Sequence, residues 1–96
     1  MLFQNLTDGL SNTQVNFLKA LINDVEKFSS QAVILEYGLG TSANITKIKK
    51  MLISKEIIDA EGGRITFLDP LYKAWLKEYY FNKKIEFNTR NLKNLI

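Results

Sequence analysis

The sequence predicts an α+β fold of the winged helix-turn-helix class, with a three-helix core, a two-stranded β-hairpin wing and a C-terminal aromatic helix. Residues 39–56 have the pattern of an amphipathic helix that is entered through a short glycine turn. Residues 57–68 alternate between apolar and polar side chains around Gly62 and Gly63, as a hairpin does. Asp69-Pro70 then begins an aromatic-rich helix. A helix that follows a short turn and leads directly into a hairpin is the central part of this architecture.

The composition argues against an enzyme. Ninety-six residues suffice for one small hydrophobic core. The sequence has no cysteine and no histidine, which excludes disulfides and thiolate metal sites and removes the commonest metal ligand and general base. Asp59 and Glu61 fall on the polar face of the hairpin, where solvated carboxylates are usual. We therefore expect no catalytic residues, no metal and no cofactor in this chain.

The location and the partners are suggested by hydropathy and charge. No apolar segment approaches membrane-spanning length and no signal peptide opens the chain, so a cytoplasmic protein without a membrane partner is expected. The net charge is +3 over residues 39–56 and +4 over residues 73–96, but −2 over residues 1–38 and again over residues 57–72. Such clustering suits an anionic partner, although charged runs also serve simply to solvate a surface.

The chain divides into a lead-in, a domain and a tail. Residues 1–9 show no sustained hydrophobic period and are interpreted as a lead-in left from a linker. The domain is predicted over residues 10–81. Its first helix covers residues 10–25, with an apolar stripe that has Phe17 on its flank. The candidate caps of this helix are Ser11, Asn12 and Thr13, and the stripe consists of Val15, Leu18, Leu21, Ile22 and Val25.

Two more helices complete the predicted core. A short second helix begins after Ser29 or Ser30, and Gly38 fits the left-handed position just past its end. Thr41 or Ser42 can cap the third helix. Its apolar face consists of Ile45, Ile48 and Leu52, and its opposite face of Ala43, Thr46, Lys47, Lys50 and Ser54.

The hairpin prediction has an internal check. A two-residue turn at Gly62-Gly63 opposes residues 58 and 67, 59 and 66, 60 and 65, and 61 and 64. This register places every apolar side chain on one face and every polar one on the other. The apolar face consists of Ile58, Ala60, Ile65 and Phe67, and the polar face of Asp59, Glu61, Arg64 and Thr66.

The last predicted helix covers residues 71–81, with the Asp69 carboxylate as its cap and Pro70 at its first position. It has more aromatic side chains than a small core usually needs on one helix. Residues 82–96 form a polar, basic tail with a weak apolar pattern.

The motifs between Leu39 and Trp75 resemble one particular module. They read Gly-Thr-Ser-Ala-Asn-Ile-Thr-Lys-Ile-Lys-Lys over residues 40–50, Gly-Gly-Arg-Ile-Thr-Phe-Leu-Asp-Pro over residues 62–70 and Tyr-Lys-Ala-Trp-Leu over residues 72–76. They are similar to the winged-helix domain that closes prokaryotic AAA-type ATPases of the archaeal-ATPase group. In that family the wing commonly ends in Asp-Pro before an aromatic helix. The resemblance covers residues 10–81.

The resemblance implies that an ATP-hydrolysing domain precedes a module of this kind. The chain itself has no Gly-x-x-x-x-Gly-Lys-Ser/Thr loop, so it lacks the phosphate cradle of such ATPases. The expectation is therefore a binding fragment of an ATPase, with no ATPase activity of its own.

Duplex DNA binding is the first functional hypothesis. The third helix would enter the major groove, where Thr46, Lys47 and Lys50 would reach phosphates or base edges. Its candidate contacts are completed by Ser42, Ala43 and Asn44 near the start of the helix and by Arg64 of the wing. The exposed face of the helix has no arginine, and Glu61 lies beside Arg64, so we expect weak binding that depends on phosphates.

Protein binding is the alternative hypothesis. The C-terminal helix would dock on the upstream ATPase domain or on another protein, and an isolated fragment would dimerise through the same patch. The candidate residues are Trp75, Tyr79, Tyr80 and Phe81. Filling of the core is the simpler interpretation for Tyr72 and Trp75. A further alternative is a free-standing small transcription regulator, whose tail would have to supply the dimer contact.

Overall fold

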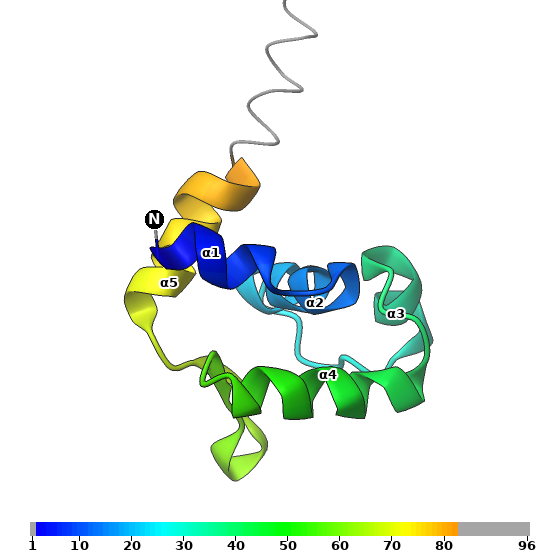
Figure 1. The fold of residues 1–96 in the computed structure, drawn as a ribbon. Helices are drawn as coiled ribbons and strands as arrows, with labels where there is room; N and C mark the ends of the chain where they lie inside the picture. Colours follow the sequence, from blue (N-terminus) through cyan, green and yellow to red (C-terminus); the bar gives the residue numbers. More distant parts are fainter. Residues whose placement is uncertain (1, 83–96) are drawn as a thin grey trace, which may run out of the picture.

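Three helices form the core of the computed structural model, which describes residues 2–82 (Figure 1). They are α2 (Asn12–Ile22), α3 (Gln31–Tyr37) and α4 (Ser42–Ser54). Both α3 and α4 pack against α2. The side chains of Ser11, Ser30 and Thr41 cap the three helices by accepting a hydrogen bond from the third residue of each, as the sequence indicated.

A wing and a C-terminal helix complete the fold. The antiparallel strands β1 (Ile58–Asp59) and β2 (Thr66–Phe67) follow α4, and η1 (Glu61–Gly63) forms the turn between them. The helix α5 (Pro70–Trp75) packs on β2 and continues into the π-helical segment η2 (Leu76–Phe81). The predicted α+β winged helix-turn-helix architecture is therefore confirmed. The predicted basic tail, from residue 83 onward, lies outside the described residues.

The hydrophobic core draws side chains from the three helices, the wing and α5. Phe17, which the sequence placed on the flank of the first helix, is instead fully buried. The reason is that Phe28, from the segment before α3, stacks on its ring at 4.3 Å between centroids and covers that flank. The remaining buried members are Leu18, Ala20, Ile34, Leu39, Ile45, Ile48, Leu52, Ile57, Ile58, Tyr72 and Leu76.

The hairpin has the predicted register over its paired residues. Ile58 lies opposite Phe67 and Asp59 opposite Thr66. The turn is closed by the Arg64 amide, which donates to the Glu61 carbonyl at 3.2 Å. Both turn glycines have positive φ, as a two-residue hairpin turn of this type requires. The ladder ends two residues before the turn, so the outer part of the wing is a loop rather than a sheet.

The N-terminal segment differs from the expectation. Residues 1–9 were expected to be a lead-in, but α1 (Leu2–Asp8) occupies most of this segment and packs against α5 (Figure 1). Its Phe3 ring lies 5.3 Å from the ring of Tyr72 and 5.8 Å from that of Trp75. The Lys55 ammonium also donates to the Gly9 carbonyl at 3.3 Å. A helix of only seven residues is too short to show a clear hydrophobic period.

Three helices end in the same way. One residue after the helix has the left-handed conformation, and the amide of the residue that follows it donates a hydrogen bond to a carbonyl in the last turn of the helix. Gly38 has this role after α3, as predicted, with φ of 65°. Asp24 and Glu56 have it after α2 and α4, with φ of 62° and 59°. The amides of Val25, Leu39 and Ile57 then donate to carbonyls five residues earlier. Because Asp24 is not glycine, no stop signal was visible there, and the predicted first helix runs three residues past the end of α2 at Ile22.

Replacement of Glu56 by glycine should stabilise the domain. A side chain in the left-handed region is strained, and glycine removes that strain at the cost of a more flexible unfolded chain. We expect Glu56→Gly to raise the free energy of unfolding by about 0.5–1 kcal/mol, measured by chemical denaturation. Gly38→Ala is the matched control. It should lower the free energy of unfolding by about 1 kcal/mol, because a Cβ at this position makes only an ordinary van der Waals contact and the positive φ is the one source of strain. A destabilised Glu56→Gly protein would contradict this account.

A buried hydrogen bond joins α1 to α5. The hydroxyl oxygens of Thr7 and Tyr72 lie 2.7 Å apart, and both side chains are buried. The single hydroxyl proton of Thr7 is already donated to the Phe3 carbonyl, also at 2.7 Å. Tyr72 must therefore be the donor to Thr7. Burial raises the pKa of the Tyr72 hydroxyl above its ordinary value of 10.0.

This raised pKa predicts a loss of stability in alkali. The unfolded chain releases the Tyr72 proton near its ordinary pKa, whereas the folded chain retains it to higher pH. The contribution of Tyr72 is thus complete below about pH 10 and is lost as the pH rises through the folded-state pKa. Chemical denaturation near pH 8 and near pH 11 measures it. Tyr72→Phe should cost about 1 kcal/mol near pH 8 and should show a smaller alkaline loss than the unaltered protein. Equal losses in both proteins would refute the assignment.

Candidate functional site

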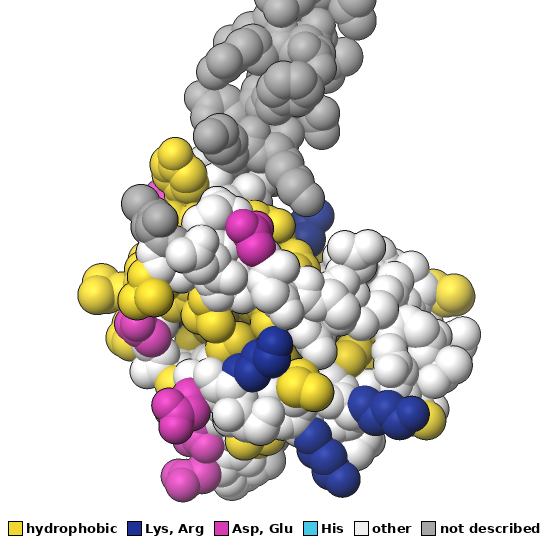
Figure 2. Space-filling model, in the orientation of Figure 1, with side chains coloured by type: hydrophobic (Ala, Val, Ile, Leu, Met, Phe, Trp, Pro, Cys, Tyr) yellow, Lys and Arg dark blue, Asp and Glu magenta, His cyan; other side chains and the backbone are white. Residues whose placement is uncertain are grey.

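The exposed face of α4 is the first candidate site. Thr46, Lys47 and Lys50 are all exposed there, as predicted, while Ile45, Ile48 and Leu52 on the opposite face are buried. Ser42 and Ala43 are exposed at the start of the helix. Figure 2 shows basic side chains spaced along α4 and acidic side chains gathered near the wing. The structure thus brings five of the seven predicted DNA-binding residues onto one solvent-exposed surface.

Asn44 has a structural role that the sequence did not reveal. Its side-chain amide donates to the Leu39 carbonyl at 2.9 Å, and its backbone amide donates to the Thr41 side chain at 3.2 Å. Both bonds hold the turn between α3 and α4. A hypothetical Cβ on Gly40 would lie only 3.1 Å from the Asn44 amide nitrogen, so this side chain is also packed tightly against the turn. Asn44 is therefore half-buried and helps to orient α4 through the turn that precedes this helix.

Loss of the Asn44 amide should weaken the turn rather than a ligand contact. We expect Asn44→Ala to lower the free energy of unfolding by about 1 kcal/mol, because the Leu39 carbonyl loses its donor. Ser42→Ala, two residues earlier, is the matched control and should change stability little, since Thr41 caps the helix. Thermal and chemical denaturation of the two variants would compare them. Equal stability of the two variants would contradict the structural role of Asn44.

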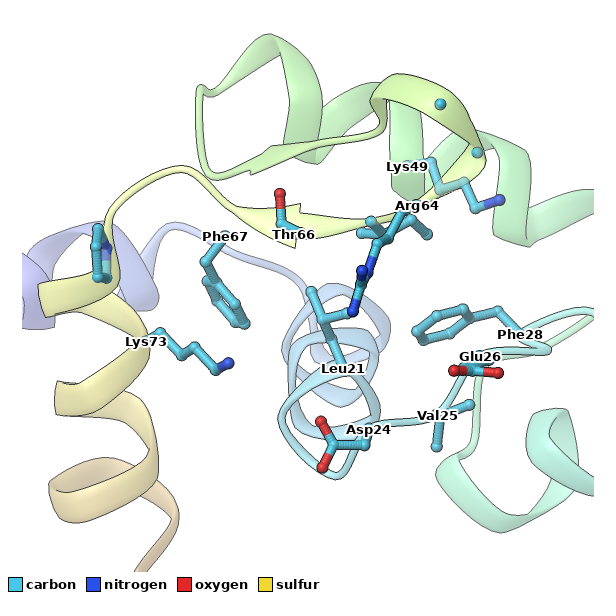
Figure 3. A pocket seen from close by; sticks show the side chains of 14 residues that line it. Leu21, Asp24, Val25, Glu26, Phe28, Lys49, Arg64, Thr66, Phe67 and Lys73 are labelled. Carbon is cyan, nitrogen blue, oxygen red and sulfur yellow. The ribbon is translucent and has the colours of Figure 1, made fainter.

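Arg64 lies apart from this face. Its side chain extends from the wing toward Leu21 at the C-terminal end of α2 (Figure 3). Glu61 is exposed at the turn of the wing and brings a negative charge there. The prediction that Arg64 accompanies the lysines of α4 on a common DNA-binding surface therefore finds no support in its position, and the wing adds little positive charge to that surface.

A groove runs between the wing and the segment that follows α2, with a volume of about 610 Å³. Figure 3 shows basic side chains entering it from three elements, namely Lys49 of α4, Arg64 of the wing and Lys73 of α5. Asp24 and Glu26 supply the opposite charge from the segment after α2. Sequence reasoning missed this groove because its two sides are about forty residues apart, and no local motif links them.

The apolar lining of the groove comes from both sides. Leu21, Val25 and Phe28 belong to α2 and the segment after it, whereas Ile65 and Phe67 belong to the wing. Residues 62–67 line the groove without interruption, so it follows the whole of β2 and the turn before it. The arrangement is an open channel with an apolar lining and charges of both signs.

The aromatic helix has a divided role. Tyr72 is 2% exposed and belongs to the core, while Trp75, Tyr80 and Phe81 are partly buried and pack against it. Tyr79 is 53% exposed. Three of the four predicted protein-binding residues therefore pack against the core while remaining partly exposed. The indole Nε1 of Trp75 is buried without a hydrogen-bond partner.

Two properties of the described residues concern metal binding and membrane insertion. Among residues 2–82, no three His, Cys, Asp or Glu side chains are grouped so as to hold a metal ion. No helix in that range is both long enough and apolar enough to cross a membrane. The surfaces described above suit binding by charge and by shape.

Comparison with known protein families gives a match over most of the chain. A family model described as "Probable winged helix domain" matches residues 1–78, which include α1 as well as the helices and wing that follow it. No curated protein and no solved structure matches the chain significantly.

Proposed function

Because the chain belongs to the family of probable winged helix domains, we propose that it is a binding module that contacts duplex DNA through the exposed face of α4. Domains of this class are in general non-catalytic modules for binding nucleic acid or protein. The element that such folds place in the major groove is the second helix of the helix-turn-helix, which here is α4.

The exposure of Lys47 and Lys50 is the observation that carries this proposal. They lie three residues apart on α4, so their ammonium groups project from the same side of the helix. Thr46 adds a hydroxyl and Ala43 a small apolar surface on that side. The buried opposite face fixes the helix in the core, so the lysines are presented on a rigid element.

The character of the surface predicts weak binding. Arg64 points into the groove and Glu61 lies at the turn of the wing, so among residues 2–82 few cations besides the lysines of α4 are placed to meet phosphates. Release of counterions from about two or three phosphates gives a slope of roughly −2 to −3 for log affinity against log salt concentration. No arginine is present for bidentate guanine recognition on α4, so little base specificity is expected.

A titration of a fluorescent generic duplex by anisotropy, at low and at physiological salt, tests the proposal. We expect binding that weakens with salt at the slope given above and falls at least tenfold in the Lys47→Glu/Lys50→Glu variant, because that variant replaces attraction to phosphates by repulsion. The matched control is Lys19→Glu/Lys77→Glu, which changes the net charge equally on exposed positions of α2 and η2. Absence of binding at low salt, or equal losses in both variants, would refute a DNA-binding role for α4.

The proposed biological setting is an AAA-type ATPase. The resemblance of residues 10–81 to the winged-helix domains that close archaeal-ATPase-group proteins supports this setting. In it, the domain would guide or anchor an ATP-hydrolysing domain on DNA, in the cytoplasm. The intact mass of the native gene product tests the proposal, because a product no larger than 11.1 kDa leaves no room for an ATPase domain.

Protein docking through α5 is the second candidate function. Leu71 is 70% exposed on α5 and Leu2 is 79% exposed on α1, the helix that packs against α5. Large apolar side chains of this exposure are typical anchors at protein interfaces. This surface would become the leading candidate if the duplex titration shows no binding.

A further inference from the structure

We propose that the groove beside β2 is a docking site for an extended peptide segment, which adds to the wing as a third, antiparallel strand. The partner that fits best is a segment in which apolar and acidic residues alternate. This site is separate from the exposed face of α4 and does not depend on the proposed binding of DNA.

The hydrogen-bond pattern of the wing supports strand addition. The Leu68 amide donates to the Ile57 carbonyl at 3.0 Å, and Phe67 lies directly opposite Ile58. In an antiparallel pair the residues alternate between those that bond to the partner strand and those whose backbone groups point away. The amide and carbonyl of Phe67 therefore point away from β1. Ile65 lies just outside the paired residues, and an added strand that extends the sheet would pair with its backbone as well. This edge of β2 is a row of backbone donors and acceptors that another extended chain can pair with.

The groove provides the space that such a strand needs. It lies along residues 62–67 and reaches across to Val25 and Phe28 (Figure 3). Its volume of about 610 Å³ is within the usual range of sites that hold a drug-sized ligand, so it can take up the side chains of a short stretch of an added strand. An added strand would lie about 4.8 Å from β2, between the wing and the segment after α2.

The lining of the groove specifies an alternating partner. Residues of an added antiparallel strand that lie opposite Ile65 and Phe67 share the face of these side chains, which is the half-buried, apolar side of the wing. Apolar residues fit there. The intervening residues face the polar side of the wing, where Arg64 lies next to the added strand and Asp59 and Glu61 belong to the other arm of the hairpin. Among the charged side chains that line the groove itself, Lys49, Arg64 and Lys73 outnumber Asp24 and Glu26. Acidic residues are therefore preferred at these alternate positions.

The probe is a capped seven-residue peptide of alternating valine and glutamate, titrated into the isotope-labelled full chain and followed by NMR. We expect the amides of Ile65 and Phe67 to exchange rapidly with solvent in the free protein and to become protected when the peptide binds. The amide of Leu68, which is already bonded to Ile57, should change little. Slow exchange of the Ile65 and Phe67 amides before peptide is added would mean that the chain covers its own edge, and it would overturn the proposal.

Two peptides of the same sequence, each methylated at three backbone nitrogens, make the test specific. In the antiparallel arrangement the valine amides face β2 and the glutamate amides face away. Methylation of the valine nitrogens should weaken binding at least tenfold, because hydrogen bonds to β2 are lost. Methylation of the glutamate nitrogens should be tolerated. Equal affinity of the two methylated peptides would exclude strand addition.

Protein variants separate this site from the others. Arg64→Glu should weaken binding of the glutamate-containing peptide about three- to tenfold, whereas Lys47→Glu/Lys50→Glu, which alters the DNA-binding candidate, should leave it unchanged. If the α4 variant alone weakens binding, the peptide is held by nonspecific charge and the proposal fails. If the free chain sediments as a dimer at high concentration and the peptide dissociates this dimer, the groove is occupied by a second copy of the chain. That result would also overturn the proposal.

Discussion

The side chain of Tyr72 joins parts of the domain that are far apart in the sequence. Its ring contacts Phe3 of α1, Phe67 of the wing and Trp75 on its own helix, and its hydroxyl donates to Thr7. The wing and the N-terminal helix are thus both positioned through one buried residue of α5. Because the ring is apolar and the hydroxyl has a partner, its burial brings hydrophobic stabilisation without an unsatisfied polar atom. The location of the wing, and with it the groove, depends on this residue.

Local patterns in the sequence sufficed for most of the fold. The period of α4 distinguished its buried face from its exposed face, and the glycine pair at residues 62–63 fixed the register of the hairpin. Gly38 marked a helix end because glycine is the usual residue in the left-handed conformation. Asp24 and Glu56 occupy equivalent positions without glycine, and only the backbone of the folded chain reveals them.

The candidate site was less predictable for reasons of geometry. Exposure on α4 followed from helical periodicity, so Lys47 and Lys50 could be identified from the sequence. Asn44 has the same polar character, but the direction of its side chain depends on the turn behind it. The position of Arg64 depends on how the wing sits against α2, which is set by contacts between residues some forty positions apart. A single sequence does not contain that information in any local pattern.

The range of sequence separations among these interactions has a consequence for folding kinetics. The bonds that end α2, α3 and α4 each span five residues, whereas the bond between Thr7 and Tyr72 spans 65. Short-range contacts cost little chain entropy and form early, and long-range contacts form only after the ends of the chain have been brought together. The three-helix core should therefore be structured in the folding transition state before α1 docks on α5. On this view α1 and α5 act mainly to slow unfolding, so that they prolong the lifetime of the folded domain more than they speed its formation.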